Sequence, residues 1–183
     1  MHIGVEYTIF ETKWGYFGLA GAQSGIFRTH LPAQTQDSVK IALLAGLSRP
    51  RRNMNYFTAL QDKITAYFEG SYVDFSRGVP LLLDGMSFFA RGVLTACRDI
   101  TYGQTISYGQ LARRAGQPNA ARAVGAVMAR NPMPLLIPCH RVLRGDGQIG
   151  GFSAAGGVEL KKKLLGHEKC CLAQPIAAGS RVL

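Results

Sequence analysis

The spacing of apolar residues changes along the chain, and this change limits the possible folds more than any other feature. In the first third, the segments HIGVEYTIF, WGYFGLAGA and SGIFRTHL alternate apolar with polar residues and are separated by polar or glycine-containing breaks. Alternation of period two is typical of half-buried strands, so these segments predict a small antiparallel sheet. After residue 53 the period becomes helical, which indicates an α/β protein.

One amphipathic helix is predicted to follow the strands. In NMNYFTALQDKITAYFEG the apolar residues recur at helical spacing, and a glycine follows as a stop signal: Phe57, Leu60, Ile64, Phe68 and Gly70. The next stretch, 70–85, has strand-like residues broken by Gly78 and Pro80. We interpret it as a connection, and we expect two domains, 1–80 with α/β organisation and 81–183 with mainly helical structure.

The second domain is predicted to contain a helix-turn-helix. MSFFARGVLTACRDI forms a helix with Cys97 on its apolar face, as a core residue. A short helix capped by Ser107 ends at Gly116, and a second, NAARAVGAVMAR, follows Gln117-Pro118 and stops at Asn131-Pro132. The second helix is rich in alanine and glycine, so it can lie close to another backbone. That backbone is either DNA or a neighbouring helix.

Positive charge is concentrated in the second half. Residues 1–85 hold eight Lys and Arg against seven Asp and Glu, a balance of +1, whereas residues 86–183 hold thirteen against four, a balance of +9. An uneven distribution of this kind predicts a basic face whose partner is a polyanion such as nucleic acid. A merely solvated basic surface is the alternative.

The sequence also indicates a compartment. It has no apolar run of about 18 residues and no signal-peptide pattern, so we expect a cytoplasmic protein without a membrane span. Four irregularly spaced cysteines suit a reducing compartment. No C-x-x-C pair occurs, so we expect no metal site, although His2 and His30 stay open as ligands.

The segment LIPCHRV (136–142) places a cysteine at the end of an apolar run. Cys139 is either a buried core residue or a nucleophile, and a free thiol with a pKa of about 8.5 needs a neighbour to ionise it at neutral pH. His140 is adjacent, but consecutive side chains of an extended segment point apart, so a sharp turn or a bridging water is required. Pro138 favours such a turn. Glu168 is one of few carboxylates that could orient the imidazole.

Five motifs together resemble a known family. SYGQLA (107–112), NAARAVGAVMARNP (119–132), LLIPCHRV (135–142), GGFS (150–153) and LLGHE (164–168) are similar, in this order, to the O6-alkylguanine-DNA alkyltransferases, also called methylated-DNA–protein-cysteine methyltransferases. The resemblance covers about residues 80–168. It implies a ribonuclease-H-like α/β domain followed by a helical domain with a winged-helix-like helix-turn-helix.

The resemblance also implies roles for the chemical residues. Cys139 matches the cysteine that accepts the alkyl group, and His140 the histidine that takes its proton through a water. Glu168 matches the carboxylate that orients this histidine. Tyr108 matches the tyrosine that lies against the phosphate backbone and donates a hydrogen bond to the departing guanine, and Asn131 the hinge asparagine before the active-site segment.

Other matches concern the DNA and the base. Arg122 matches the arginine that fills the place of the flipped nucleotide, and the small residues around it are expected in the DNA groove: Ala120, Ala121 and Gly125. The base pocket is expected to involve Met128, Ser153 and the backbone carbonyls of Cys139 and Val142. Two roles stay open for Arg141, a contact with a DNA phosphate and an internal salt bridge.

The implied function is DNA repair in a single turnover. An alkyl group moves from O6-alkylguanine, with O4-alkylthymine as a second candidate, to Cys139 after the nucleotide is flipped out of double-stranded DNA. We expect no cofactor, sequence-independent binding in the minor groove, and a monomer without an obligate protein partner. A cysteine-based alkylation sensor that regulates transcription and a cysteine hydrolase are the alternatives.

Two features depart from the family pattern. The stretch SAAGGVELKKK between Phe152 and Leu164 is about two residues longer than expected, which leaves the role of Ser153 open. The adjacent Cys170 and Cys171 match no family motif, and we expect two ordinary thiols because a disulfide between neighbours is strained.

Overall fold

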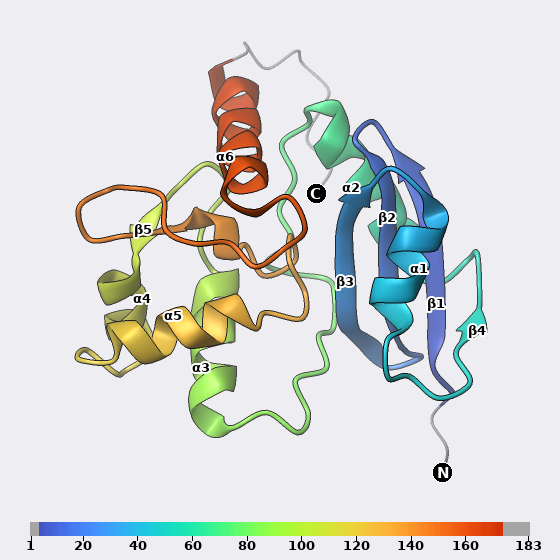
Figure 1. Ribbon diagram of the computed structural model, residues 1–183, viewed down its shortest axis with the longest axis horizontal. Helices are drawn as coiled ribbons and strands as arrows, with labels where there is room; N and C mark the ends of the chain where they lie inside the picture. Colours follow the sequence, from blue (N-terminus) through green and yellow to red (C-terminus); the bar gives the residue numbers. More distant parts are fainter. Residues whose placement is uncertain (1–3, 174–183) are drawn as a thin grey trace.

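The computed structural model describes residues 4–173, and its first half is built on a four-stranded sheet (Figure 1). The strand order is β3-β2-β1-β4, with β1 (Glu6–Thr12), β2 (Gly15–Ala22) and β3 (Gly25–Ala33) antiparallel and β4 (Arg51–Arg52) parallel to β1. The predicted antiparallel sheet is confirmed. Strand β4 was not predicted, because two exposed residues carry no periodicity. His2 lies outside the described residues.

Two helices cover opposite faces of this sheet. Helix α1 (Gln36–Leu44) packs Val39 and Leu43 against one face, where a Cβ at Gly18 would lie only 2.7 Å from Val39. Helix α2 (Thr58–Glu69) covers the other face and ends at Gly70, whose φ of 107° suits glycine. Helix α2 confirms the predicted helix. Helix α1 was missed because it buries only two residues.

The second half is mainly helical, as predicted. It contains α3 (Phe88–Arg98), α4 (Tyr108–Arg114), α5 (Ala121–Ala129) and α6 (Gly157–Ala173). The predicted cap of α4 is confirmed, because the Ser107 hydroxyl accepts from the Gln110 N–H while the Gln110 side chain accepts from the Ser107 N–H. Gly116 follows this helix with a φ of 73°. None of the described helices has the length and apolar character needed to cross a bilayer.

Short elements connect the helices around Cys139. The 3₁₀ turn η1 (Cys139–Arg141) leads into β6 (Val142–Leu143), which pairs in parallel with β5 (Ile106–Ser107) directly before α4. The helices lie beside the β3 edge of the sheet (Figure 1). There the Thr29 backbone N–H and hydroxyl donate to the carbonyls of Pro132 and Pro134 at 2.9 and 2.7 Å.

One apolar core runs through both halves. Buried residues of the sheet and α2, such as Phe17 and Tyr67, belong to the same cluster as Cys97 and Ile137 of the second half. Cys97 is fully buried on α3, as predicted. The segment around Cys139 is therefore packed by elements from both halves of the chain.

Candidate active site around Cys139

Cys139 begins a sharp turn at the end of a buried run. The turn is closed by a hydrogen bond from the Arg141 N–H to the Pro138 carbonyl at 2.9 Å. From the sequence, contact between Cys139 and His140 needs a sharp turn or a bridging water. The turn is present, but within residues 4–173 no direct hydrogen bond joins the two side chains, so a water is still needed. Just upstream, buried Leu135 has a φ of 78°, a left-handed conformation that costs a residue with a side chain about 1–2 kcal/mol.

Asn131 binds the thiol directly. Its Nδ2 donates to Cys139 Sγ at 3.2 Å and to the Ile137 carbonyl at 2.8 Å, and its Oδ1 accepts from the Met133 N–H at 3.0 Å. These contacts fix which end of the amide faces sulfur. Burial raises the pKa of the Cys139 thiol, whereas the Asn131 hydrogen bond and the Lys161 ammonium oppose this rise. The thiol is therefore protonated at rest, with neighbours that favour its thiolate form.

Lys161 is a fully buried cation beside the site. Its Nζ donates to the Val142 carbonyl at 2.6 Å and lies 5.8 Å from the centre of the Tyr108 ring. Within residues 4–173 no carboxylate forms an ion pair with it. Burial lowers the pKa of Lys161, and the nearby thiols of Cys139 and Cys97 counter this effect.

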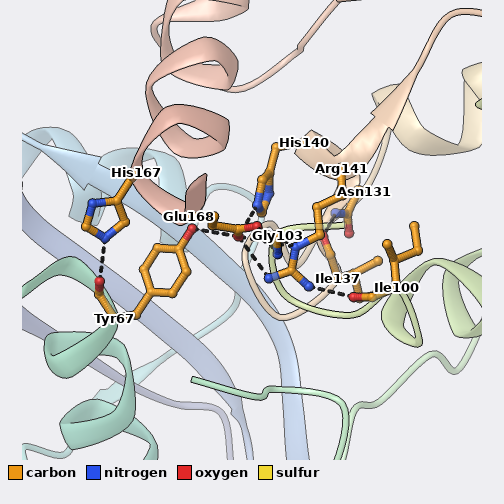
Figure 2. Close-up of polar contacts among 9 residues, drawn as sticks. All are labelled: Tyr67, Ile100, Gly103, Asn131, Ile137, His140, Arg141, His167 and Glu168. Carbon is orange, nitrogen blue, oxygen red and sulfur yellow. Dashed lines mark hydrogen bonds and ion pairs between the residues drawn. The ribbon is translucent and has the colours of Figure 1, made fainter. Parts of the chain in front are cut away.

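His140 and Glu168 form a buried pair. His140 Nε2 lies 2.8 Å from Glu168 Oε1, and both side chains are almost completely buried (Figure 2). Burial lowers the pKa of His140, although Glu168 counters this, so the imidazole is neutral at pH 7. Because the carboxylate only accepts, Nε2 carries the hydrogen. Nδ1 then has a free lone pair, and no described group binds it.

Arg141 neutralises the Glu168 carboxylate. Its Nη2 and Nε contact Oε1 and Oε2 at 2.8 and 3.0 Å, and its Nη1 donates to the Ile100 carbonyl at 2.6 Å (Figure 2). Burial would raise the pKa of Glu168, but hydrogen bonds and charge from His140 and Arg141 hold it below its ordinary value. With 5% of its surface exposed, Arg141 forms the internal salt bridge and does not present its charge to a phosphate.

Two clefts reach Cys139. One, of about 360 Å³, is lined by Tyr108, Gly125, Met128, Ala129, Cys139, Gly151, Phe152 and Ser153. The half-buried Tyr108 ring lies between two glycines, where a Cβ at Gly125 or Gly150 would be 4.0 or 3.2 Å from it. The other cleft, of about 290 Å³, approaches from β3 and includes Arg28 and His30. Small-ligand sites begin at about 300 Å³, a volume that the first cleft exceeds and the second almost reaches.

The predicted residues thus fall into two groups. One group lines the first cleft, binds the thiol or forms the buried histidine–glutamate pair: Cys139, Asn131, His140, Glu168, Tyr108, Gly125, Met128 and Ser153. Val142 is buried in the adjoining β6. The other group lies outside both clefts: Arg122 is exposed on α5, and Ala120 and Ala121 are half-buried at the start of this helix.

Sequence reasoning missed Lys161 as a site residue. The buried residues of α6 are Lys161, Leu164 and Glu168, so the helical spacing from Glu168 was the available signal. The adjacent Cys170 and Cys171 are both free thiols, as expected. Within residues 4–173 no three His, Cys, Asp or Glu side chains are placed to hold a metal ion.

Comparison with known proteins agrees with this arrangement. Residues 88–170 match the sequence profile of the 6-O-methylguanine DNA methyltransferase DNA-binding domain. The chain is 33% identical to the rat methylated-DNA–protein-cysteine methyltransferase over 96% of its own length and 87% of that protein. It is 42% identical to the Mycobacterium bovis protein of the same name over 90% and 93% of the two chains.

A solved structure has a similar fold. The Mycobacterium tuberculosis protein OGT, crystallised in complex with DNA, superposes with a TM-score of 0.74 at 32% identity, covering 91% of this chain and 94% of that one. The site has a buried cysteine at a cleft, followed in the chain by a histidine that pairs with a buried glutamate. Together with relatives named protein-cysteine methyltransferases, it identifies a cysteine-based transferase. The chain belongs to the methylated-DNA–protein-cysteine methyltransferase family.

Proposed function

We propose that the protein repairs DNA by moving an alkyl group from the O6 atom of guanine to Cys139 Sγ. The observation that carries this proposal is the thiol itself, which borders the 360 Å³ cleft and receives the Asn131 hydrogen bond, with a neutral imidazole next to it in the chain. The relatives named for the same transfer support it.

The proposed reaction balances within the site. A water relays the Cys139 proton to the free Nδ1 of His140, and Glu168 stabilises the imidazolium through Nε2–H. The thiolate attacks the alkyl carbon, so an S–C bond forms while the C–O6 bond breaks. The electron pair of that bond stays on guanine, and a hydrogen bond from the Tyr108 hydroxyl stabilises it. The thioether has no easy reversal, so each chain acts once.

The base would be held by backbone and side-chain groups of the same cleft. We propose that the Cys139 and Val142 carbonyls accept from the guanine amino group, with Met128 and Ser153 on the walls. The Val142 carbonyl already accepts from Lys161 at 2.6 Å, but a carbonyl oxygen has two lone pairs and can accept again. Asn131 would hold the turn that carries the Cys139 carbonyl and leads into Val142.

DNA binding is assigned to α4 and α5. Their short, glycine-containing connection supports the helix-turn-helix. Arg122, which is exposed on α5, would enter the base stack from the minor groove. Ala120, Ala121 and Gly125 would let α5 approach the backbone. Residues 86–183 hold thirteen Lys and Arg against four Asp and Glu, a balance that suits sequence-independent binding to phosphates.

The domain assignment is part of this proposal. The strand order β3-β2-β1-β4, with β4 parallel to β1, supports a ribonuclease-H-like domain in residues 1–80. Residues 81–183 would then form the winged-helix-like DNA-binding and transfer domain. Neither needs a cofactor for the chemistry proposed.

A stoichiometry experiment tests the proposed function. A duplex oligonucleotide with one O6-methylguanine is added in tenfold excess, and the lesions that disappear are counted against the chains present. We expect one guanine restored per chain and no reaction with an unmethylated duplex. Repeated turnover, or a released small methylated product, would favour a hydrolase and overturn the proposal.

Arg122 separates nucleotide flipping from chemistry. Arg122→Ala is expected to slow repair of the duplex strongly but to change reaction with free O6-alkylguanine base little, because the free base needs no extrusion. Arg52→Ala, which removes an exposed charge from β4, is the matched control and should react like the wild type. Equal losses of Arg122→Ala on both substrates would make Arg122 structural.

A further inference from the structure

Glu168 receives one hydrogen bond from the first half of the chain. The hydroxyl of Tyr67, on α2, donates to Glu168 Oε1 at 2.9 Å, and no part of the Tyr67 side chain is exposed (Figure 2). The two residues are 101 positions apart in the sequence. The carboxylate that binds His140 is thus also bound by the half of the chain that carries neither the thiol nor the excess of positive charge.

The donors are divided unequally between the two carboxylate oxygens. Oε1 accepts from His140, Arg141 and Tyr67, whereas Oε2 accepts from Arg141 and the Gly103 N–H at 2.9 Å. His140 therefore shares its acceptor oxygen with the Tyr67 hydroxyl. Each donor that binds Oε1 draws charge from it and reduces its attraction for an imidazolium.

Tyr67 is placed to act only as a donor. Burial and the neighbouring carboxylate raise the pKa of its phenol, so the hydroxyl keeps its proton. Its ring packs against four aromatic neighbours at centroid distances of 5.1 to 5.9 Å: Phe68, Phe75, Tyr102 and His167. His167 Nε2 also lies 2.6 Å from the Tyr67 carbonyl, which ties α6 to α2 one residue before Glu168 (Figure 2).

We propose that Tyr67 is a positioning residue for alkyl transfer, which fixes Glu168 Oε1 and limits how strongly that oxygen attracts the proton on His140. The inference rests on the proposed function. It gives the α/β domain a part in the proton transfer, through a hydroxyl that touches neither the alkyl group nor the thiol. Among the described residues, the other ionisable groups facing His140 and Glu168 are Arg141, Lys161 and Tyr102.

The test is Tyr67→Phe in the full chain, with Tyr56→Phe as the matched control. Phenylalanine keeps the ring and its aromatic packing. Tyr56 is also a buried tyrosine of the first half, but its hydroxyl donates to the carbonyls of Ala22 and Gly25, away from the site. Methyl transfer from a methylated duplex is timed between about pH 5 and pH 8, below the unfolding temperature of each variant.

We expect Tyr67→Phe to slow transfer about tenfold at pH 7.5, because Oε1 is no longer fixed and the His140 ring loses its position. This loss outweighs the stronger attraction of Oε1 for the imidazolium and is within reach of one hydrogen bond to a charged group. The acidic fall in rate should also move to higher pH, because Oε1 now holds the imidazolium proton more strongly. NMR titration of the His140 ring should show the same upward movement without any reaction. Tyr56→Phe should react like the wild type, whatever its stability.

Two results would count against these ideas in different ways. If Tyr67→Phe keeps the wild-type rate, acidic limb and His140 titration, Tyr67 only packs the interface and the inference is overturned. If the wild type itself transfers no methyl group to Cys139, the proposed function fails, and the inference fails with it.

Discussion

The two buried cysteines of the core, Cys97 and Cys139, differ in the backbone that carries them and in their polar neighbours. Burial raises the pKa of both thiols. Cys97 lies on α3 among apolar residues, and no described group forms a hydrogen bond with its sulfur. Cys139 lies on a turn, accepts from Asn131 and borders two clefts. Burial by itself keeps a thiol inert, and it is the turn, the cleft and the polar neighbours that make one reactive.

Substitution of each cysteine in turn should give the largest difference in methyl transfer. Cys139→Ser is expected to abolish methyl transfer while leaving affinity for DNA nearly unchanged, because the proposed phosphate contacts do not involve the thiol. Cys97→Ala should transfer at close to the wild-type rate and lose about 1 kcal/mol of stability as a small cavity forms. Transfer rates and denaturant unfolding measure both. A Cys97→Ala protein that folds but cannot transfer would break the distinction.

Removal of the His140 imidazole, the proposed proton acceptor, should make Cys139 unreactive like Cys97. In His140→Gln no neutral imidazole can take the thiol proton, so the transfer rate should fall by roughly 10²–10⁴-fold. DNA affinity is the control and should not change. A rate within a few fold of the wild type would show that the proton leaves by another path.

Loss of the buried cation should have a smaller effect. Lys161→Met removes the positive charge that favours the Cys139 thiolate, so transfer is expected to slow about tenfold, equivalent to one pKa unit. Stability should change little, because removal of a buried charge that has no carboxylate partner within residues 4–173 offsets the lost hydrogen bond to the Val142 carbonyl. The control is Lys162→Met on the same helix, where the lysine is exposed and pairs with Glu159. Equal rates for both variants would remove Lys161 from the site.

Mild acidification should have the smallest effect on the transfer rate. The pKa of His140 lies below its ordinary 6.5, so the imidazole stays neutral in the folded protein at pH values where a free one is protonated. The transfer rate should stay level from about pH 8 to 6.5 and fall only below that. The lowered pKa also makes stability depend on pH. The contribution of neutral His140 to the free energy of unfolding is complete above pH 6.5 and is lost as the pH falls through the pKa of His140 in the folded protein. A rate that already halves at pH 7 would show that the imidazole is not held neutral.

The local spacing of residues in the sequence predicted more of the fold than of the buried charged contacts around His140 and Glu168. Strands β1 to β3, helix α2 and the Ser107 cap follow from periods and caps within a few residues of each other. Helix α1 buries only Val39 and Leu43, too few to show a period. Its position depends on the sheet that it covers.

The site was predictable where family motifs mark its residues. Cys139, His140 and Glu168 could be placed by resemblance, and the structure brings His140 and Glu168 into contact. The remaining contacts depend on tertiary packing. Lys161 stands in a run of three lysines that resembles a solvated face, and Tyr67 meets Glu168 across 101 residues.

The most direct measurement of the central claim identifies the sulfur that carries the methyl group. After reaction with an equimolar methylated duplex, trypsin releases the peptide from Asn131 to Arg141, in which Cys139 is the single cysteine. We predict one methyl group per chain, located by mass spectrometry on this peptide and absent from the peptide containing Cys97. A methyl group on Cys97, Cys170 or Cys171, with Cys139 unmodified, would contradict the account.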